Sequence, residues 1–365
     1  MPGCRARHTS QTARTPERCK PTTFQRVEQM KILVLATGAL AVTLPLSVQA
    51  QDANESRFSA EVTIELQNDY TFDSSDTANE LNDTFATIEG ALSFALGPES
   101  SIHSTLVIEP ITDPTGDRFF EDHGLYAEEL FFSHNFENVE IVLGKFNPGF
   151  GVAWDTAPGI YGTDFAEDYE LTERLGAGVN VSLGGDQHVF SVAVFQADRT
   201  ILSDSLGKER GQTGLAAGGP SNTEGPQSYS FSLSGEVGDT GYNVGFQNQA
   251  RGMGDAEDQL GYVAGLTHQF NSIELLGEVA YFEHFDGTTS SAVYTTVGAA
   301  VPVGPVTLSG VYSHRDIEGA PNDDLVTVSA EMELIDGLTG ALGYRWADEG
   351  GEDTQTIGTL LVYEF

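Results

Sequence analysis

Alternation of apolar and polar residues, repeated many times, is the feature that most constrains the fold of this sequence. In residues 58–67 the apolar side chains of Phe58, Val62 and Leu66 alternate with polar ones such as Glu61. A period of two is the pattern of a β-strand with one apolar and one polar face. Sixteen such runs follow residue 50, each near the roughly ten residues of a tilted membrane-spanning strand; they cover 57–70, 84–97, 100–111, 124–136, 138–149, 174–184, 187–198, 227–237, 240–251, 259–270, 272–284, 291–302, 304–316, 324–335, 338–348 and 354–365.

The connections between these runs alternate between long and short. The odd-to-even links are long and polar, as in "FDSSDTANELND" and residues 150–173, whereas the even-to-odd links are tight, as in "GPES", "EN" and "GGD". Long loops at one end and short turns at the other are typical of outer-membrane barrels. Sixteen closed strands enclose a lumen too wide for side chains to fill, so the polar face must meet water and the apolar face lipid. The sequence therefore predicts an all-β fold, a transmembrane up-and-down antiparallel β-barrel of about sixteen strands, with long extracellular loops and short periplasmic turns.

The N-terminal 50 residues have a different character. Residues 1–29 are basic and have no apolar period, and we interpret them as a disordered extension created by a mis-called start, with Met30 as the true first residue. Residues 30–50, "MKILVLATGALAVTLPLSVQA", predict a Sec signal peptide cleaved after Ala50. An uncleaved membrane anchor is the alternative. Residues 51–365 then form the barrel.

The rest of the chain is strongly acidic and contains no cysteine. The full sequence has a formal net charge of −37, and both cysteines, Cys4 and Cys19, lie in the basic extension. A disulfide scaffold and a thiolate metal site are therefore excluded for residues 51–365. Such a charge repels nucleic acid and attracts cations, although a saline habitat would also explain it. The acidic loops "DEGGED" and "NDD" could hold Ca²⁺ or Mg²⁺ loosely, without EF-hand spacing, and no other cofactor is expected.

The chain ends on "LLVYEF", a strand pattern that stops on an aromatic residue without a polar tail. Together with the signal peptide, the sixteen runs and the absence of cysteine after residue 50, this ending resembles the Gram-negative outer-membrane porins of the general diffusion kind. The resemblance implies that the last strand closes the barrel against the first. It also implies an assembly signal read by the barrel-assembly machinery, a homotrimer, and an outer-membrane location among lipid and lipopolysaccharide; the signal residues would be Leu361, Tyr363 and Phe365.

In porins the third long loop folds into the lumen and narrows it, and residues 150–173 are the third long loop here. The resemblance therefore makes this segment the candidate constriction loop, although it lacks the porin Pro-Glu-Phe-Gly-Gly-Asp motif. Its second half predicts a short helix capped by Asp164, with Glu167 three residues later and an apolar side that packs, formed by Phe165, Tyr169 and Leu171. An ordinary exposed acidic loop is the alternative.

Strand parity assigns charged residues to the lumen. The candidate constriction residues come from the loop and from a sparse set of wall arginines; they are Asp155, Asp164, Glu167, Asp168, Glu170, Glu173, Arg174, Arg315 and Arg345. The candidate lumen wall is acidic, and its members are Glu61, Glu65, Glu89, Glu109, Glu236, Glu274, Glu278, Glu331 and Glu333. Arg251 is assigned to the lumen as well, whereas alternation leaves Lys145 on either face. Trp154 and Trp346 are expected in an interfacial aromatic girdle.

No catalytic motif accompanies this pattern. The sequence has no G-x-S-x-G elbow, H-E-x-x-H, P-loop or G-x-G-x-x-G, so an enzyme is not expected. We interpret the chain as a passive diffusion channel for small hydrophilic solutes and ions. Because acids dominate the assigned lumen, a preference for cations is expected. The alternatives are a channel specific for a sugar or a particular ion and, among non-channel barrels, an adhesin or a hydrolase with its site at the rim.

Overall fold

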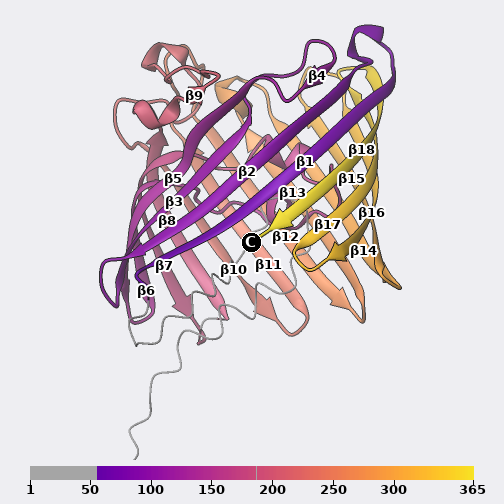
Figure 1. Cartoon of the computed structure of the whole chain (residues 1–365). Helices are drawn as coiled ribbons and strands as arrows, with labels where there is room; N and C mark the ends of the chain where they lie inside the picture. Colours follow the sequence, from indigo (N-terminus) through magenta and orange to yellow (C-terminus); the bar gives the residue numbers. More distant parts are fainter. Residues whose placement is uncertain (1–55, 186) are drawn as a thin grey trace, which may run out of the picture. The chain divides into compact units, whose positions relative to one another are not determined.

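The computed structural model describes residues 56–185 and 187–365. Within them the chain forms one antiparallel sheet of sixteen long strands, each paired with its neighbours along the chain, and β1 also pairs with β18. That last pairing closes the sheet into a barrel (Figure 1). The predicted all-β barrel of sixteen strands is confirmed. The expectations for residues 1–29 and 30–50, and for both cysteines, lie outside the described residues.

Every predicted run overlaps one long strand. The strands are β1 Phe58–Ser74, β2 Asn82–Ala95, β3 Ser100–Pro110, β5 His123–Phe136, β6 Val139–Phe146, β7 Arg174–Leu183, β8 His188–Ala197, β10 Ser228–Val237, β11 Thr240–Gln249, β12 Gln259–Phe270, β13 Ile273–Glu283, β14 Ala292–Val303, β15 Val306–Ile317, β16 Asp323–Ile335, β17 Leu338–Glu349 and β18 Glu352–Glu364. Two-residue strands lie in the loops, β4 Arg118–Phe119 and β9 Leu206–Gly207. The helical turns are η2 Thr77–Asn79, α2 Ala153–Thr156, α3 Asp164–Glu167, η3 Ile201–Ser203, η4 Leu215–Ala217 and η5 Phe285–Gly287. No helix in the described ranges is long and apolar enough to cross a membrane.

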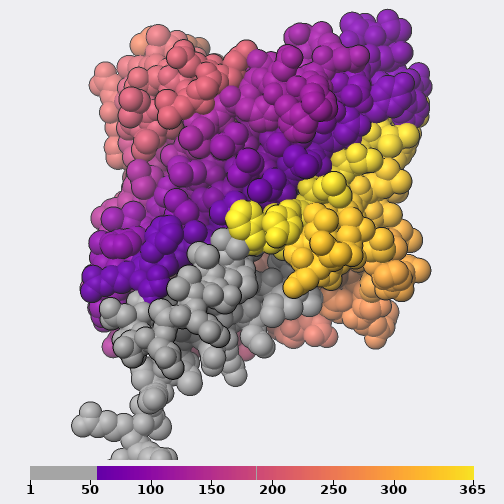
Figure 2. All heavy atoms as spheres, viewed as in Figure 1, coloured from indigo at the N-terminus to yellow at the C-terminus, as the bar shows by residue number. Residues whose placement is uncertain are grey.

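The closure joins the two ends of the barrel-forming chain. Leu66 of β1 pairs with Leu361 of β18, and Thr63 pairs with Glu364. Figure 2 shows the first strands, in indigo, in direct contact with the last, in yellow, on the outer surface. The aromatic rings of Tyr363 and Phe365 stack at the end of the closing strand, with centroids 5.5 Å apart. Among the long strands of the described ranges, closure pairs both edges of the sheet, so β18 is not left as an exposed edge.

The two faces of each strand separate as alternation predicts. In β13 the side chains of Leu275, Val279 and Tyr281 are 44%, 48% and 39% exposed on the outer face. The intervening residues Ala280 and Phe282 are fully buried on the inner face. Exposed aliphatic and aromatic side chains recur on the outside of the other strands. An outer surface of this kind is stable only when lipid covers it.

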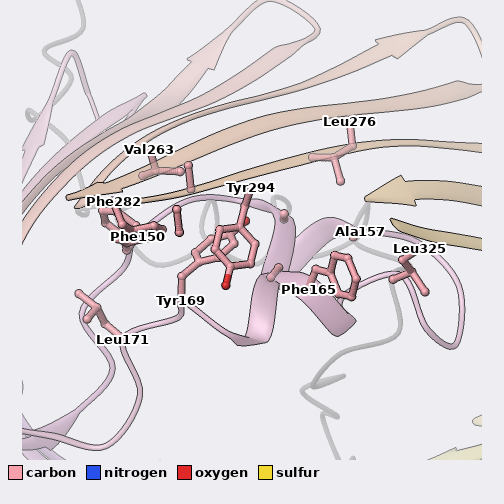
Figure 3. Packing of buried hydrophobic residues seen from close by; sticks show 14 of the residues in the cluster. Phe150, Ala157, Phe165, Tyr169, Leu171, Val263, Leu276, Phe282, Tyr294 and Leu325 are labelled. Atoms are coloured by element: carbon pink, nitrogen blue, oxygen red, sulfur yellow. The ribbon is translucent and has the colours of Figure 1, made fainter. Parts of the chain in front are cut away.

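A compact apolar cluster lies inside the barrel, in place of a lumen wall that is polar throughout. Phe150 and Tyr169 come from the segment between β6 and β7, and they pack against Phe282 of β13 and Tyr294 of β14 (Figure 3). The ring centroids of Tyr169 and Tyr294 are 5.0 Å apart, and those of Phe150 and Phe282 are 6.0 Å apart. This cluster holds residues 150–173 against the inner face of the wall.

Candidate pore constriction

Residues 150–173, called the inner loop below, are fixed to the lumen face of the barrel by hydrogen bonds. The backbone N–H of Gly151 donates to Asn243 Oδ1 of β11 over 3.2 Å. The N–H groups of Val152 and Ala153 both donate to Glu278 Oε2 of β13. Glu278 Oε1 also accepts a bond of 2.6 Å from the Tyr169 hydroxyl. Glu278 is therefore an anchor for the loop and is only 3% exposed, so its carboxylate does not line a water-filled passage.

The inner loop then follows the wall as far as the closing strands. Ile160 N–H donates to Ser329 Oγ of β16 over 3.1 Å, and the Tyr161 hydroxyl donates to Asp69 Oδ1 of β1 over 2.6 Å. Among the described residues, the hydrogen bonds from the body of the loop to the barrel strands reach β11, β13, β14, β15, β16, β17 and β1. The loop thus covers the sector from β11 to β1, and the sector formed by β2, β3 and β5 stays open to the lumen.

The predicted short helix exists as α3, but its predicted cap is wrong. Thr163 occupies the N-cap position and makes no side-chain capping bond. The carboxylate of Asp164 instead accepts from Arg345 Nε over 2.7 Å. This bond joins two opposite charges, and it holds the carboxylate against β17 instead of at the N-terminus of the helix. The apolar side is as expected, since Phe165, Tyr169 and Leu171 are 3%, 4% and 0% exposed.

Two wall arginines are neutralised by acids of the inner loop and of the strand ends. Arg315 Nη1 lies 2.6 Å from Asp168 Oδ2, and its Nε lies 2.7 Å from Asp323 Oδ2. Arg345 pairs with Asp164 and, through Nη2, with Glu349 Oε1 over 2.6 Å. Each guanidinium therefore meets two close carboxylates. These arginines clamp α3 to β15 and β17 and add little positive potential to the lumen.

The base of the inner loop is locked by a separate charge network. Glu173 accepts from Lys145 Nζ over 2.6 Å and from both terminal nitrogens of Arg210. Alternation did not decide which face of the strand carries Lys145. The structure shows that Lys145 is 1% exposed and that its Nζ lies 3.1 Å from Asp198 Oδ2. Glu173 therefore stabilises the loop base and does not belong with Glu167, the exposed acid of α3. Arg210, from the long segment between β8 and β10, was not foreseen because no strand parity applies there.

Glu167, the exposed acid of α3, lies close to acids of the uncovered sector. Glu167 makes no ion pair with any described residue. Desolvation, followed by the negative charges of Asp164, Glu109, Asp168 and Asp113, raises the pKa of Glu167 to about 7. Glu109 belongs to β3 and Asp113 to the loop after it, so Glu167 lies within electrostatic reach of that wall. Glu167 of the inner loop and Glu109 of β3 are therefore neighbouring acids from the loop and from the uncovered sector.

The uncovered sector and the adjoining strand β1 carry five carboxylates, called the acidic wall below: Glu65, Glu89, Glu109, Glu128 and Glu129. Glu89 is at the centre of this group, because each of the other four carboxylates lies within electrostatic reach of it. None of the five has an ion pair within the described part of the chain. Glu109 accepts from the Tyr126 hydroxyl, Glu128 from Asn147 Nδ2, and Glu129 from Asn147 N–H and Thr105 Oγ1.

Glu128 and Glu129 escaped the sequence prediction because of a β-bulge. The register between β3 and β5 shifts at Thr105 and Leu106, which pair with Glu129 and Ala127 and leave Glu128 as the extra residue. A bulge interrupts strict alternation, so both neighbouring acids reach Asn147 on the lumen side. The doublet itself is the signal that could have revealed the bulge. Strict alternation would place one of two adjacent acids on the lipid face, where a carboxylate is unfavourable.

Most of the remaining assigned residues lie near the short turns or in an outer loop. Glu61, Glu236, Glu274, Glu331 and Glu333 are placed near the short-turn ends of their strands. Arg251 follows β11 in an exposed loop, where its N–H and guanidinium bond to Asp258 and to Ala256 O. The side chain of Asp155 in α2 of the inner loop has accessible surface, and desolvation by the surrounding protein raises its pKa. The described residues contain no group of three or more His, Cys, Asp or Glu that could hold a metal ion.

The expected position of Trp154 is wrong. It lies in α2 of the inner loop, partly buried against the apolar cluster inside the barrel. Trp346 is in β17 beside Val326 of β16, on the strand face that also carries exposed Leu342. The sequence placed Trp154 at the interface because it follows a strand, and alternation gives no sign that the chain turns inward at that point.

A closed antiparallel barrel of sixteen long strands, with a loop packed inside and an acidic opening beside it, defines a porin-type barrel. Comparison with solved structures agrees. The chain is similar to the outer membrane channel DcaP of Acinetobacter baumannii, with a TM-score of 0.62, 10% identity, and coverage of 84% of this chain and 97% of that one. It is also similar to Salmonella typhi OmpF, solved in complex with daunomycin, with a TM-score of 0.60, 11% identity and coverage of 84% and 97%.

An anion-selective porin from Comamonas acidovorans matches with a TM-score of 0.58 and 12% identity, covering 85% of this chain and all of that one. No family model and no curated protein matches the sequence. At these identities the comparisons establish the fold, and the described chain has the fold of the Gram-negative outer-membrane porins. Because an anion-selective porin shares the fold, the direction of charge selectivity has to be argued from the side chains.

Proposed function

We propose that this protein is an outer-membrane porin, a passive diffusion channel for small hydrophilic solutes and ions that prefers cations. The observation that carries the proposal is the unequal compensation of charge beside the inner loop. Arg315 and Arg345 are neutralised by loop and strand-end carboxylates. The acidic wall has no basic partner within ion-pair distance among the described residues, and Glu167 adds a further acid from the inner loop.

The physical argument concerns the field inside a narrow, water-filled opening. Low-dielectric walls focus field lines, so carboxylates without counter-charges raise the local concentration of cations. Salt screens this effect over about 10 Å at 0.1 M, so the preference should be largest in dilute solution. The channel reading fits the fold better than an enzyme, because the charged residues of the lumen are either paired within the wall or spread along an open passage.

Planar-bilayer recording tests the proposal. The purified, folded protein should give stepwise conductance, and in a dilute KCl gradient the zero-current potential should have the sign of K⁺ preference. A folded protein that never conducts would favour the adhesin or rim-hydrolase alternatives. Conductance with chloride preference would retain the channel and reject the role given to the acidic wall.

The likeness to outer-membrane porins supports a proposal for the cellular setting of the channel. We propose insertion in the outer membrane after export directed by residues 30–50, with lipid against the apolar outer face and lipopolysaccharide around the long loops. We also propose a homotrimer, assembled with the help of the barrel-assembly machinery acting on Leu361, Tyr363 and Phe365. Cross-linking in bilayers or gentle detergent tests the oligomer, and a monomer under both conditions would count against it.

A further inference from the structure

A cavity on the long-loop side of the inner loop combines charges of both signs. It has a volume of about 330 Å³ and lies between the end of the inner loop and the loop ends of β7, β11, β12, β14 and β15. Arg315 and Asp168, the pair that clamps α3, form part of its lining, so the cavity borders the proposed passage. Its size falls at the lower end of the roughly 300–1,000 Å³ found for small-molecule sites in proteins.

Three ionisable groups in the cavity have no ion pair with any described residue: Arg174, Glu170 and Asp286. Opposite charges that share a cavity normally close into an ion pair when their side chains can reach each other. Here Arg174 opens β7, Glu170 lies four residues before it in the inner loop, and Asp286 belongs to the turn η5 after β13. Glu170 and Arg174 lie within electrostatic reach of each other but form no ion pair, and all three groups line the cavity.

Arg174 is held in place by its strand and by an aromatic ring. It pairs with Phe146 of β6 and with Ala197 of β8, and its guanidinium carbon lies 6.0 Å from the centroid of the fully buried Phe195 ring. Its Nε is buried and has no hydrogen-bond partner in the described residues. No described residue accepts a hydrogen bond from the guanidinium, and its terminal nitrogens can donate two parallel bonds to a ligand carboxylate.

The acidic groups of the cavity suit a positive group. Burial, followed by the charges of Asp155 and Glu278, raises the pKa of Glu170 well above its ordinary value. Burial and the charge of Asp255 raise the pKa of Asp286. An ammonium group placed between them would stabilise both ionised forms. The rings of Tyr294 and Phe285 and the side chains of Pro220 and Ile317 supply an apolar surface between the charged groups.

We propose that this cavity binds a small zwitterionic solute of the amino-acid type, with its carboxylate on Arg174 and its ammonium group on Glu170 and Asp286. The apolar lining favours an aliphatic or aromatic side chain over a polar one. Binding itself does not require conduction. The role of the cavity as a site that loads solute next to the passage rests on the proposed channel function.

Ligand-observed NMR on the folded protein in detergent tests the proposal, with L-leucine as the probe. Leucinamide, which lacks the carboxylate, and N-acetylleucine, which lacks the ammonium group, are matched comparison ligands. Leucine should bind at least about tenfold more tightly than either, since each charged bond is worth more than one decade of affinity. The R174Q variant should lose the preference over leucinamide, and a Glu170→Gln, Asp286→Asn double variant the preference over N-acetylleucine.

Arg251→Gln is the matched control, because it removes an arginine from an exposed loop outside the cavity. Circular dichroism and the heat-dependent gel mobility of the barrel establish that each variant is folded. Equal affinity for the three ligands, no leucine binding by folded wild type, or unchanged binding in R174Q would overturn the proposal. Bilayer conductance of the same preparations separates the two ideas: a conducting protein without leucine binding rejects the site alone, and leucine binding without conductance rejects the channel alone.

Discussion

The acidic wall and the arginine side of the barrel are adjacent regions with opposite treatment of charge. On β15 and β17, Arg315 and Arg345 are each compensated by two carboxylates within 2.7 Å. On β1, β2, β3 and β5, five carboxylates are held by neutral donors or by none; none forms an ion pair with a described residue, although Arg210 lies within electrostatic reach of Glu109. The difference shows that a list of lumen charges does not give the lumen field. What matters is which charges are already paired within the wall.

Removing charge from the acidic wall tests this difference between the two regions most directly. In the triple variant Glu89→Gln, Glu109→Gln, Glu128→Gln, we expect the K⁺-to-Cl⁻ permeability ratio in dilute KCl to fall by about fivefold or more, because each carboxylate contributes a sizeable potential at short range. Reversal potentials in a salt gradient measure the ratio. The control is Glu61→Gln, Glu236→Gln, Glu333→Gln, the same charge change near the short turns, which should have a much smaller effect. Equal effects of the two triples would mean that total charge, and not its position, sets selectivity.

The second prediction concerns the anchor that keeps the inner loop away from the acidic wall. Glu278→Ala removes the acceptor of Val152 N–H, Ala153 N–H and the Tyr169 hydroxyl. Leaving buried donors unsatisfied should lower the free energy of unfolding by about 1–3 kcal/mol. Denaturant titration followed by circular dichroism measures this loss. Single-channel recording should show a noisier and larger conductance, since the loop is no longer fixed to β13.

Glu274→Ala is the matched control for the anchor, because it lies on the same strand and faces the same side near the turn end. It should leave both the unfolding midpoint and the channel noise near wild type. If Glu278→Ala and Glu274→Ala behave alike, the apolar cluster of Phe150, Tyr169, Phe282 and Tyr294 holds the loop alone.

The strands and their faces could be predicted from the sequence because both depend on local alternation, a property that each strand carries by itself. The end of the barrel that carries the long loops could be predicted in the same way, because the lengths of the connections are read directly from the sequence. The roles of individual carboxylates could not be predicted. Glu278 and Glu274 are indistinguishable by parity, yet only Glu278 meets the inner loop, and that meeting depends on contacts more than 100 residues apart in sequence.

Two further failures have definite physical causes. Asp164 was predicted to cap α3, but Arg345, which lies 181 residues away in the chain, takes its carboxylate. The doublet Glu128–Glu129 was missed because a bulge cancels the parity rule at that one position. In both cases tertiary contacts or a register shift overrode a correct local pattern. The residues that set the field are the ones for which local rules are least informative.

The third prediction tests the role of a paired arginine on the arginine side of the barrel. Arg345→Gln frees Asp164 and Glu349 from their shared counter-charge, so cation preference should rise by about twofold in dilute salt. Reversal potentials again provide the measurement, with Arg251→Gln in its exposed loop as the control. A loss of cation preference in Arg345→Gln would show that the arginine acts by positioning α3 and not through its charge.

The smallest expected effect is a pH response carried by Glu167. Its pKa is raised to about 7, so the carboxylate is charged above that pH and becomes neutral as the pH falls below it. Cation preference should therefore decline between about pH 8 and pH 6, before acids with ordinary pKa values titrate. Glu167→Gln should have a lower preference at pH 8 and a flatter response across this window, whereas Glu352→Gln, an exposed acid at the start of β18, should keep the wild-type slope. Reversal potentials at constant ionic strength follow the change. A Glu167→Gln channel that retains the full pH response would show that the response comes from the acidic wall and not from Glu167.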